Sequence, residues 1–290
     1  MPMLWQTSRH LIDLGIPRVM GIVNVTPDSF SDGGRHATTM AARAHAERLV
    51  EEGADILDIG GESTRPGSQP PTLTEEMVRV LPVVRHAVTL GVPVSVDTSR
   101  PEVIDAVLAE GADIINDIRA LRFPGALGAV ARHLRAGVCL MHMQGEPATM
   151  QQEPHYADVA GEVAAFLASR LQAALSAGVG PERIVLDPGY GFGKTHEHNL
   201  TLFRQQDALL SLGRPLLVGW SRKGTLGQIT GRPLGERLTA SVAAALAAVA
   251  RGARVVRVHD VAATVDALKV WSAAGLAATQ QEQNQGARIP

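Results

Sequence analysis

The sequence contains a single cysteine, few aromatic residues and an almost balanced charge. Cys139 has no second cysteine to pair with, which excludes an intramolecular disulfide, and its apolar neighbours favour a buried thiol over a nucleophile. Because aromatic residues make up only 3% of the chain, we expect a core of Val, Ile, Leu and Ala. The formal net charge is −2, from 27 basic and 29 acidic residues, and the chain has no basic run. These features predict no nucleic-acid partner.

Long hydrophobic runs are also missing. No apolar stretch reaches the ~18 residues that a membrane-spanning helix needs. Residues 1–16 are interrupted by Arg9, His10 and Asp13, which is unlike a signal peptide. We therefore expect no membrane partner and a cytoplasmic location. The 290 residues, 45% of them hydrophobic, are enough for one large α/β domain or two smaller ones.

The chain does contain a recurring unit. An Ala-rich amphipathic stretch leads to a glycine and then to a short Val/Ile/Leu run that ends in a polar residue, as in EEGADILDIGGES, LGVPVSVDTS, AEGADIINDI, RAGVCLMHM and RGARVVRVHD. The glycine is suited to end a helix in a left-handed conformation, and the run that follows is too short and too β-branched to continue the helix. Each unit therefore predicts a helix followed by a β-strand.

Eight apolar runs predict strands, at 19–24, 56–59, 94–97, 114–117, 138–141, 184–187, 216–219 and 255–259. Helices are predicted at 38–52, 73–90, 101–110, 126–134, 157–177, 199–212, 234–251 and 261–273. The strands are apolar on both faces, as parallel strands covered by helices are. Eight such units in about 260 residues match a single (β/α)8 TIM barrel. A doubly wound parallel sheet is the alternative.

The barrel is predicted to occupy residues 18–274. The N-terminal segment, 1–17, precedes the first unit, and we expect it to close the bottom of the barrel. The stretch 275–290 contains the run QQEQNQG and is expected to be a polar C-terminal tail. We assign no function to either segment.

Polar residues stand where the predicted strands end, which is where catalytic groups lie in a TIM barrel. They are Asn24, Glu62, Ser63, Thr64, Asp97, Asn116, His142, Asp187, Lys223, Arg257 and His259. A single carboxylate at such a position can equally be a helix N-cap or a salt-bridge partner, as Asp97 illustrates, since it stands shortly before a helix that begins at Pro101. Asp58 and Asp117 are given a structural role on this ground.

One side of this ring suits an anion. Arg257 and His259 alternate on the last strand, so their side chains are expected on one face, and Asn24 of the neighbouring first strand lies close when the barrel closes. A guanidinium, an imidazole and an amide that converge in this way suit a phosphate or a pyrophosphate.

The opposite side suits a flat polar ring. Asp97, Asn116 and Asp187 offer hydrogen-bond acceptors to a heterocycle rich in donors. Lys223 offers a cation to a carbonyl oxygen or a ring nitrogen. The residues alone thus predict a site that binds an anion at one end and a polar heterocycle at the other.

The string KTHEHN, residues 194–199, has two histidines with the spacing of a metal-binding pair. His196 and His198 stand on a loop that opens a predicted helix. In that setting histidines more often face solvent or cap the helix, so we favour the capping interpretation over a metal site.

The most informative string is MGIVNVTPDSFSDGG, residues 20–34, in which a β-branched strand is followed by a turn-rich polar loop. An ordinary surface connection is the alternative interpretation. Together with DILDIGGESTRPG at 55–67, the string resembles the signatures of the dihydropteroate synthase family. The blocks SVDTS, IINDI, LMHMQG, DPGYGFGK, SRK and RVHDV follow in that family's order, so the resemblance covers roughly residues 19–270.

The resemblance implies a role for each matching residue. The implied catalytic residues are Asn24, Lys223, Arg257 and His259. The implied pterin-binding residues are Asp97, Asn116, Met141, Asp187, Gly219 and Lys223. The implied pyrophosphate-binding residues are Asn24, Thr64, Arg257 and His259, with Mg²⁺ contacting Asn24. The implied aminobenzoate-binding residues are Phe30, Thr64, Arg65, Pro66, Gly191, Phe192 and Lys223.

The implied reaction is displacement of pyrophosphate from 6-hydroxymethyl-7,8-dihydropterin diphosphate by the amine of 4-aminobenzoate. The electron-rich pterin can stabilise positive charge on its exocyclic methylene, so cleavage of the C–O bond can run ahead of attack. Catalysis then consists of stabilising the leaving pyrophosphate and excluding water. An aniline-type amine is neutral at pH 7, so no general base is assigned.

Two features leave alternatives open. Gly224 follows Lys223 where the family commonly has Ser or a longer polar residue that can hold the aminobenzoate carboxylate, a role that backbone N–H groups of the following helix can also fill. The small residues of 239–249 can pack on the barrel or on a second subunit, and the family's tendency to dimerise favours a homodimer. The rival functions are a non-catalytic pterin-binding paralogue and a barrel that transfers a methyl group from a folate to cobalamin.

Overall fold

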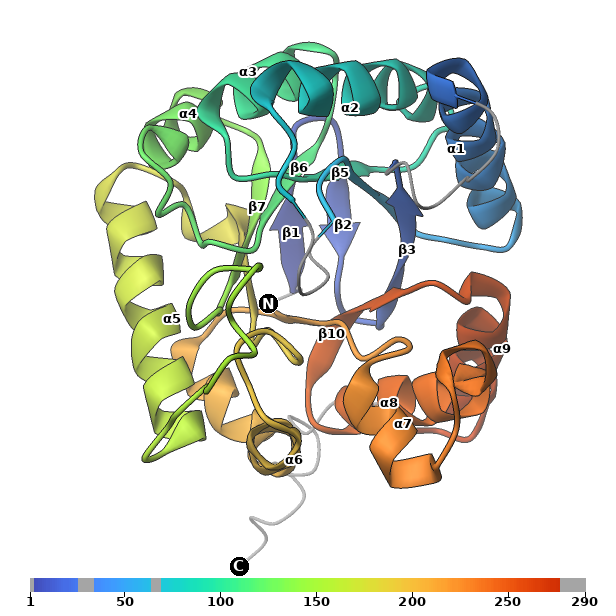
Figure 1. Ribbon diagram of the computed structural model, residues 1–290, viewed down its shortest axis with the longest axis vertical. Coiled ribbons are helices and arrows are strands. Elements are labelled where there is room, and N and C mark those ends of the chain that lie inside the picture. The colour runs from blue at the N-terminus through green and yellow to red at the C-terminus, as the bar shows by residue number, and fades with distance from the viewer. Residues whose placement is uncertain (1–2, 26–33, 64–68, 277–290) are drawn as a thin grey trace, which may run out of the picture.

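The barrel strands run parallel and close on themselves in the order β10-β3-β4-β5-β6-β7-β8-β9 (Figure 1). The computed structural model describes residues 3–25, 34–63 and 69–276. Within this part of the chain the barrel strands are β3 (Arg18–Asn24), β4 (Ile56–Gly60), β5 (Val94–Asp97), β6 (Ile114–Asp117), β7 (Gly137–Met141), β8 (Ile184–Asp187), β9 (Leu216–Val218) and β10 (Ala253–Val258). The predicted (β/α)8 barrel is therefore confirmed, and a doubly wound sheet is excluded.

Helices surround the strands as an outer ring (Figure 1). They are α1 (Gly34–Glu51), α2 (Leu73–Ala87), α3 (Pro101–Ala109), α4 (Ala126–Arg132), α5 (Val159–Ser176), α6 (His196–Arg204), α7 (Gly224–Thr230), α8 (Leu238–Ala250) and α9 (Val261–Ala273), with short 3-10 helices η2 (Pro181–Arg183), η3 (Gln206–Leu212) and η4 (Leu234–Glu236). Among the residues described, none of these helices is long and apolar enough to cross a membrane.

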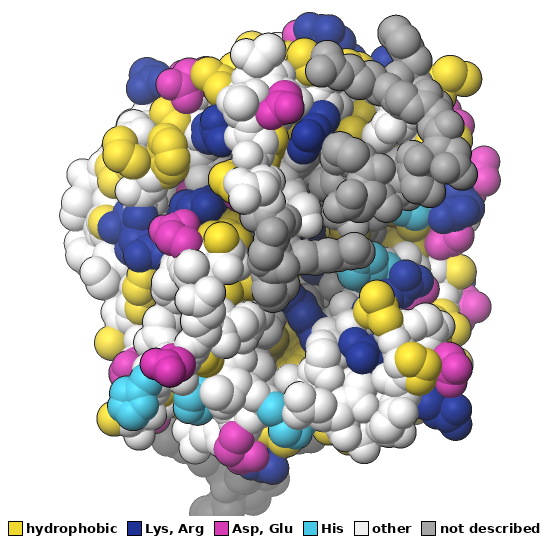
Figure 2. All heavy atoms as spheres, in the orientation of Figure 1, with side chains coloured by type: hydrophobic (Ala, Val, Ile, Leu, Met, Phe, Trp, Pro, Cys, Tyr) yellow, Lys and Arg dark blue, Asp and Glu magenta, His cyan; other side chains and the backbone are white. Residues whose placement is uncertain are grey.

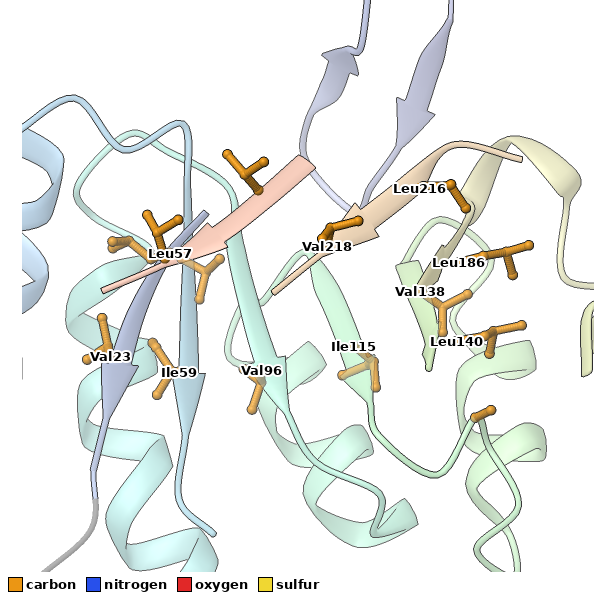
Figure 3. Close-up of a cluster of buried hydrophobic side chains, with 14 of the residues drawn as sticks. Val23, Leu57, Ile59, Val96, Ile115, Val138, Leu140, Leu186, Leu216 and Val218 are labelled. Atoms are coloured by element: carbon orange, nitrogen blue, oxygen red, sulfur yellow. The ribbon is translucent and has the colours of Figure 1, made fainter. Parts of the chain in front are cut away.

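The main hydrophobic core lies between the outer face of the barrel and the helices. As predicted, it is built from aliphatic side chains. Figure 3 shows a continuous set of them on neighbouring strands, in which Val23, Leu57, Ile59, Val96, Ile115, Val138, Leu140, Leu186, Leu216 and Val218 are labelled. Each of these side chains is buried, because a parallel strand inside a helical ring has no face that meets water.

A second core fills the amino end of the barrel interior, and the N-terminal segment covers it. That segment forms an antiparallel hairpin of β1 (Leu4–Gln6) and β2 (Leu11–Asp13). The indole Nε1 of Trp5 donates to the carbonyl oxygen of Arg183 at 2.9 Å. The cluster comprises Trp5, Ile12, Leu14, Met20, Ile56, Ile114, Cys139, Val185, Leu217 and Val255. The segment therefore closes the barrel bottom as predicted, and Cys139 is buried as predicted.

Three details of the helices differ from the prediction. The helix expected after Gly224 was given no bounds, since the sequence of α7, GTLGQIT, is short, contains an internal glycine and has no amphipathic repeat. The predicted helix 199–212 divides into α6 and η3, where the buried Gln206 side chain donates to the carbonyl oxygens of Ala248 and Arg251. The predicted helix 234–251 divides into η4 and α8. The contacts of Gln206 join segments more than 40 residues apart, so local sequence does not show the break that accompanies them.

Candidate functional site

The carboxyl end of the barrel interior is polar. Side chains alternate along a strand, so the residues two positions after the inward-facing Ile56, Ile114, Val185 and Val255 also face inward. Those residues are Asp58, Asn116, Asp187 and Arg257. Asp97 joins them, because it is paired in register with Asn116 on β6 and with Gly60 on β4. The strand register thus collects five polar side chains at the mouth, and Figure 2 shows a Lys or Arg side chain in the hollow of this face.

Arg257 and Asp58 form the centre of this group. The guanidinium Nε of Arg257 donates to Asp58 Oδ2 at 2.6 Å, and Nη2 lies 3.5 Å from Asp97 Oδ2. The amide Nδ2 of Asn116 also donates to Asp58 Oδ2, at 3.1 Å. Asp58 is fully buried. The cation that was expected to meet a pyrophosphate is therefore held between two carboxylates.

Asp58 is a salt-bridge partner, as the structural interpretation allowed, but the register places it inside the mouth of the barrel. Asp58 is in phase with Ile56 and with Gly60, and that phase marks it as inward-facing once the barrel is accepted. Its partner Arg257 is 199 residues away, so no local pattern links the two. The structural interpretation also holds for Asp117, whose carboxylate accepts hydrogen bonds from the backbone N–H groups of Arg119 and Leu121.

Several buried polar atoms at the mouth have no partner among the described residues. They are Asp58 Oδ1, Asn116 Oδ1 and Ser95 Oγ. A buried polar atom without a hydrogen bond costs about 1–3 kcal/mol. The interior of the mouth therefore offers unsatisfied acceptors to a ligand that carries N–H groups.

Burial shifts the titration of the groups around the mouth. Burial and the nearby Asp58 raise the pKa of Asp97 to about 8, against the attraction of Arg257. Burial raises the pKa of Asp187 to about 6, although Gly189 N–H donates to Asp187 Oδ1 at 2.7 Å. Burial and the repulsion of Arg257 lower the pKa of Lys223 to about 8. Such a concentration of shifted groups is typical of a binding or catalytic site.

An apolar wall stands beside the polar group. Met141 belongs to a small buried cluster with Ile118, Met143 and Met150, and Phe192 packs against that cluster. Lys223 Nζ lies 4.2 Å from the centre of the Phe192 ring, which is a cation–π distance. The predicted residues Met141, Phe192 and Lys223 are therefore brought together.

Two predicted glycines lie at the same place. Gly191 has φ +80°, and a Cβ there would approach Lys223 Cδ to 3.0 Å, so its backbone conformation and the close side chain both favour glycine. Gly219 directly follows β9, and a Cβ on it would lie 3.9 Å from Arg257 Cβ. Gly219 thus lies against the strand that carries the guanidinium.

Asn24 and His259 line a second hollow, of about 640 Å³, between β3 and α1. Its lining residues are Ile22, Asn24, Ala41, Ala44, His45, Arg48 and His259. His259 Nδ1 lies 3.0 Å from Ser221 Oγ. Burial and the positive charge of Arg257 lower the pKa of His259 to about 3, so the imidazole is neutral at pH 7. Asn24 and His259 are thus neighbours, while Arg257 turns toward Asp58 and Asp97.

Four predicted residues, Phe30, Thr64, Arg65 and Pro66, lie outside the described residues. Within the described part of the chain, no group of three or more His, Cys, Asp or Glu side chains could hold a metal ion. His198 takes part in capping α6, since its backbone N–H donates to Thr195 Oγ1 and its Nδ1 accepts from Thr195 N–H. The capping interpretation of the KTHEHN string is confirmed.

Comparisons with known proteins agree with this geometry. The chain matches the family model described as "Pterin binding enzyme" over residues 20–259. It is 54% identical over 279 residues to the dihydropteroate synthase of Neisseria meningitidis serogroup B, covering 94% of this chain and 98% of that relative.

Two solved structures of the dihydropteroate synthase of Xanthomonas albilineans are also similar. The one with 4-aminobenzoic acid has 52% identity and a TM-score of 0.90, covering 95% of this chain and 99% of the other. The one in complex with 7,8-dihydropteroate has 50% identity and a TM-score of 0.86, covering 94% and 98%.

Proposed function

The chain belongs to the pterin-binding enzymes and, within them, to the dihydropteroate synthases, and we propose how its residues divide the work of that reaction. The enzyme is a transferase that joins 6-hydroxymethyl-7,8-dihydropterin diphosphate to 4-aminobenzoate, giving 7,8-dihydropteroate and pyrophosphate. The observation that carries the proposal is the set of buried, unsatisfied acceptors around Arg257 at the barrel mouth. A donor-rich heterocycle with an anionic substituent is complementary to it.

The pterin ring is bound by Asp97, Asn116 and Asp187. Their oxygens accept from the ring N–H and amino groups, and Lys223 donates to the ring carbonyl or a ring nitrogen. Hydrogen bonds to a carboxylate favour its charged form, so binding would lower the raised pKa of Asp97. Met141, in its buried cluster, packs against the ring face.

The diphosphate is held by Asn24, Arg257 and His259, with Thr64 completing the set. The neutral His259 can donate from one ring nitrogen, and an approaching anion would raise its lowered pKa. Arg257 can keep the short hydrogen bond to Asp58 through Nε and turn the remaining N–H groups toward the anion.

This arrangement stabilises a bond cleavage. As the C–O bond breaks, negative charge grows on pyrophosphate beside Arg257, and positive charge grows on the pterin methylene beside Asp97. Preorganised charges of this kind are worth about 10²–10³ in rate for each donor. The amine of 4-aminobenzoate then attacks the methylene and loses a proton to solvent or to the released pyrophosphate.

Mg²⁺ fits the site as an ion that arrives with the substrate. Magnesium is usually bound through one or two protein oxygens together with substrate phosphates and water. Asn24 supplies one amide oxygen at the end of β3. Mg²⁺ bound there would offset negative charge on the leaving pyrophosphate.

The aminobenzoate is bound beside Phe192, Lys223 and Gly191, and Phe30, Thr64, Arg65 and Pro66 complete this pocket. The Lys223 ammonium, 4.2 Å from the Phe192 ring centre, provides a positive charge for the substrate.

One further proposal concerns the assembly. The small residues of α8 make close packing against a second copy favourable, so we propose a homodimer.

The location and the domain limits also remain proposals. The enzyme is cytoplasmic, since its substrates are small metabolites of folate synthesis. Its functional unit is the barrel at 18–274, with 1–17 as a bottom-closing segment and 275–290 as a polar tail.

The test follows pyrophosphate release from the pterin diphosphate with Mg²⁺, with and without 4-aminobenzoate, together with dihydropteroate formation. We expect release that depends on aminobenzoate and equals product one for one. Pterin binding without turnover would support a non-catalytic paralogue instead. Release without product would mean that the aminobenzoate pocket is not functional.

A further inference from the structure

Lys194 is a buried lysine for which the reaction has no use. Its side chain is 2% exposed, and its Nζ lies 2.9 Å from His142 Nδ1, 2.9 Å from the carbonyl oxygen of Gly189 and 3.1 Å from that of Phe192. An ammonium has three N–H groups to donate, and these acceptors use all of them. Within the described ranges, no carboxylate forms a salt bridge with it.

The three acceptors belong to two different segments. His142 follows β7, whereas Gly189 and Phe192 lie on the loop between β8 and α6. The two segments are in direct contact, because a Cβ on Gly189 would come within 1.9 Å of the His142 carbonyl oxygen. Lys194 therefore ties the loop to the end of the neighbouring strand.

The loop needs such a tie because its backbone is unusual. Gly189, Gly191 and Gly193 have φ values of +65°, +80° and +58°, all in the left-handed region that glycine tolerates. Glycines lose more conformational freedom on folding than other residues, so a loop that contains three of them is held by its hydrogen bonds.

This loop carries the wall of the proposed aminobenzoate pocket. The Phe192 carbonyl is bound to Lys194, and the Phe192 ring lies under Lys223 Nζ. We propose that Lys194 is a positioning residue, which holds Gly189 and Phe192 so that the Phe192 ring is placed for the second substrate. The identity of the second substrate in this inference rests on the proposed function. The geometry of the loop does not.

His142 has a matching role as an acceptor. Burial and the charge of Lys194 lower the pKa of His142 to about 2, so its Nδ1 keeps the lone pair that Lys194 uses. Its ring also packs edge-on against Phe166, with centroids 4.9 Å apart, which fixes its orientation. His142, which the sequence placed in the polar ring, thus binds Lys194 and positions the loop, and we assign it no contact with the pterin.

The test compares Lys194→Met with Lys194→Gln, which keeps a donor, and with Lys269→Met, which removes an exposed lysine of α9. We expect Lys194→Met to raise KM for 4-aminobenzoate about tenfold or more, the equivalent of one charge-assisted hydrogen bond. The KM for the pterin diphosphate should rise by a smaller factor, because its proposed ligands Asp97 and Asn116 end β5 and β6, which do not carry this loop. Lys194→Gln should recover part of the loss, and Lys269→Met should behave as wild type.

A second readout does not depend on catalysis. Hydrogen exchange of the Gly191 and Phe192 amides, which donate to Asn199 Oδ1 and to the Gly189 carbonyl oxygen, should speed up in Lys194→Met and less in Lys194→Gln. Unchanged exchange in both variants would overturn the inference, and so would equal losses of affinity for both substrates. If the wild-type protein makes no dihydropteroate, the proposed function fails, while the exchange result still decides the role of Lys194 in the loop.

Discussion

The two ends of the barrel interior differ although the same strands build both. At the amino end, Ile56, Ile114 and Val255 pack beneath Trp5 in an apolar cluster. Two residues further along the same strands stand Asp58, Asn116 and Arg257, with unsatisfied oxygens and a buried ion pair. Inward-facing side chains only two residues apart on one strand therefore have different roles. The first stabilises the fold and the second binds a ligand, as is general for TIM barrels.

The difference also shows where stability is lost. An apolar side chain at the amino end gains free energy from burial whether or not a ligand is present. At the carboxyl end, Asp58 and Asn116 each keep a buried oxygen without a partner among the residues described, so the ligand-free protein is less stable than its packing would allow. A ligand that satisfies them should stabilise the fold as well as bind.

The largest effect is expected at the amino end. Trp5→Ala removes a fully buried indole and leaves the Arg183 carbonyl oxygen without its donor, so the free energy of unfolding should fall by about 3–5 kcal/mol. Urea unfolding measures this. Turnover per folded molecule should be unchanged at low temperature. Leu11→Ala, which truncates a side chain 57% exposed on the same hairpin, is the control and should change stability little.

The second effect is expected at the carboxyl end. Arg257→Ala removes the guanidinium from the proposed pyrophosphate site and should lower turnover at least ~10²-fold, the loss typical of one preorganised charge contact. Arg254→Ala is the matched control, because Arg254 stands on the same strand but donates to the Gly15 carbonyl oxygen at the other end. Steady-state turnover of both variants decides the matter. Near-normal turnover of Arg257→Ala would remove Arg257 from the mechanism.

The strands of the barrel could be predicted from sequence more fully than the hairpin below them or the side-chain pairs at the mouth. Short apolar runs such as Ile114–Asp117 identify strands by local pattern, and the parallel barrel follows from their number. The hairpin strands Leu4–Gln6 and Leu11–Asp13 are only 3 residues each, too short to show a period. The salt-bridge partner of Asp58 could not be predicted, because only the closed barrel brings Arg257 near it.

The candidate site was predicted in composition but not in pairing. The family strings pointed to Asp97, Asn116 and Lys223, and the structure places all three at the mouth. Their charge states could not be predicted, because burial and neighbouring charges from other strands set the pKa values. The positioning role proposed for Lys194 was missed for the same reason, since its acceptors follow two different strands.

A third prediction concerns pH and the carboxylates of the mouth. Burial and Asp58 raise the pKa of Asp97 from 3.8 to about 8, so the folded protein holds a proton that the unfolded chain releases. The free energy of unfolding should therefore fall as pH rises from about 4 to 8. Asp97→Asn should flatten that fall, as urea unfolding across the pH range would show.

The exposed Asp266 of α9 provides the control for this experiment. Asp266→Asn should leave the slope of the wild-type protein unchanged. Parallel stability curves for Asp97→Asn and the wild type would mean that Asp97 is already ionised in the folded, ligand-free protein. Its pairing with Arg257 would then outweigh its burial.

The smallest effect is expected at Gly224. A Cβ on this first residue of α7 would meet nothing within 4 Å, so Gly224→Ser should change stability by no more than about 0.5 kcal/mol. The same substitution at Gly137 should destabilise by about 1–3 kcal/mol, because a Cβ there would lie 3.1 Å from Trp5 Nε1 and 3.2 Å from the Gln6 carbonyl oxygen.

The KM of Gly224→Ser for aminobenzoate tests whether the substrate carboxylate is already fully bound in the wild-type protein. If backbone N–H groups at the start of α7 already serve the carboxylate, the added hydroxyl should lower KM by less than about threefold, since a neutral hydrogen bond contributes little where the ligand is already satisfied. A fall of about tenfold or more would show that the carboxylate contact is incomplete in this chain. Gly224→Ser fits at the open carboxyl end of the barrel whichever result is found. At the packed amino end, both Gly137→Ser and Trp5→Ala should destabilise the fold.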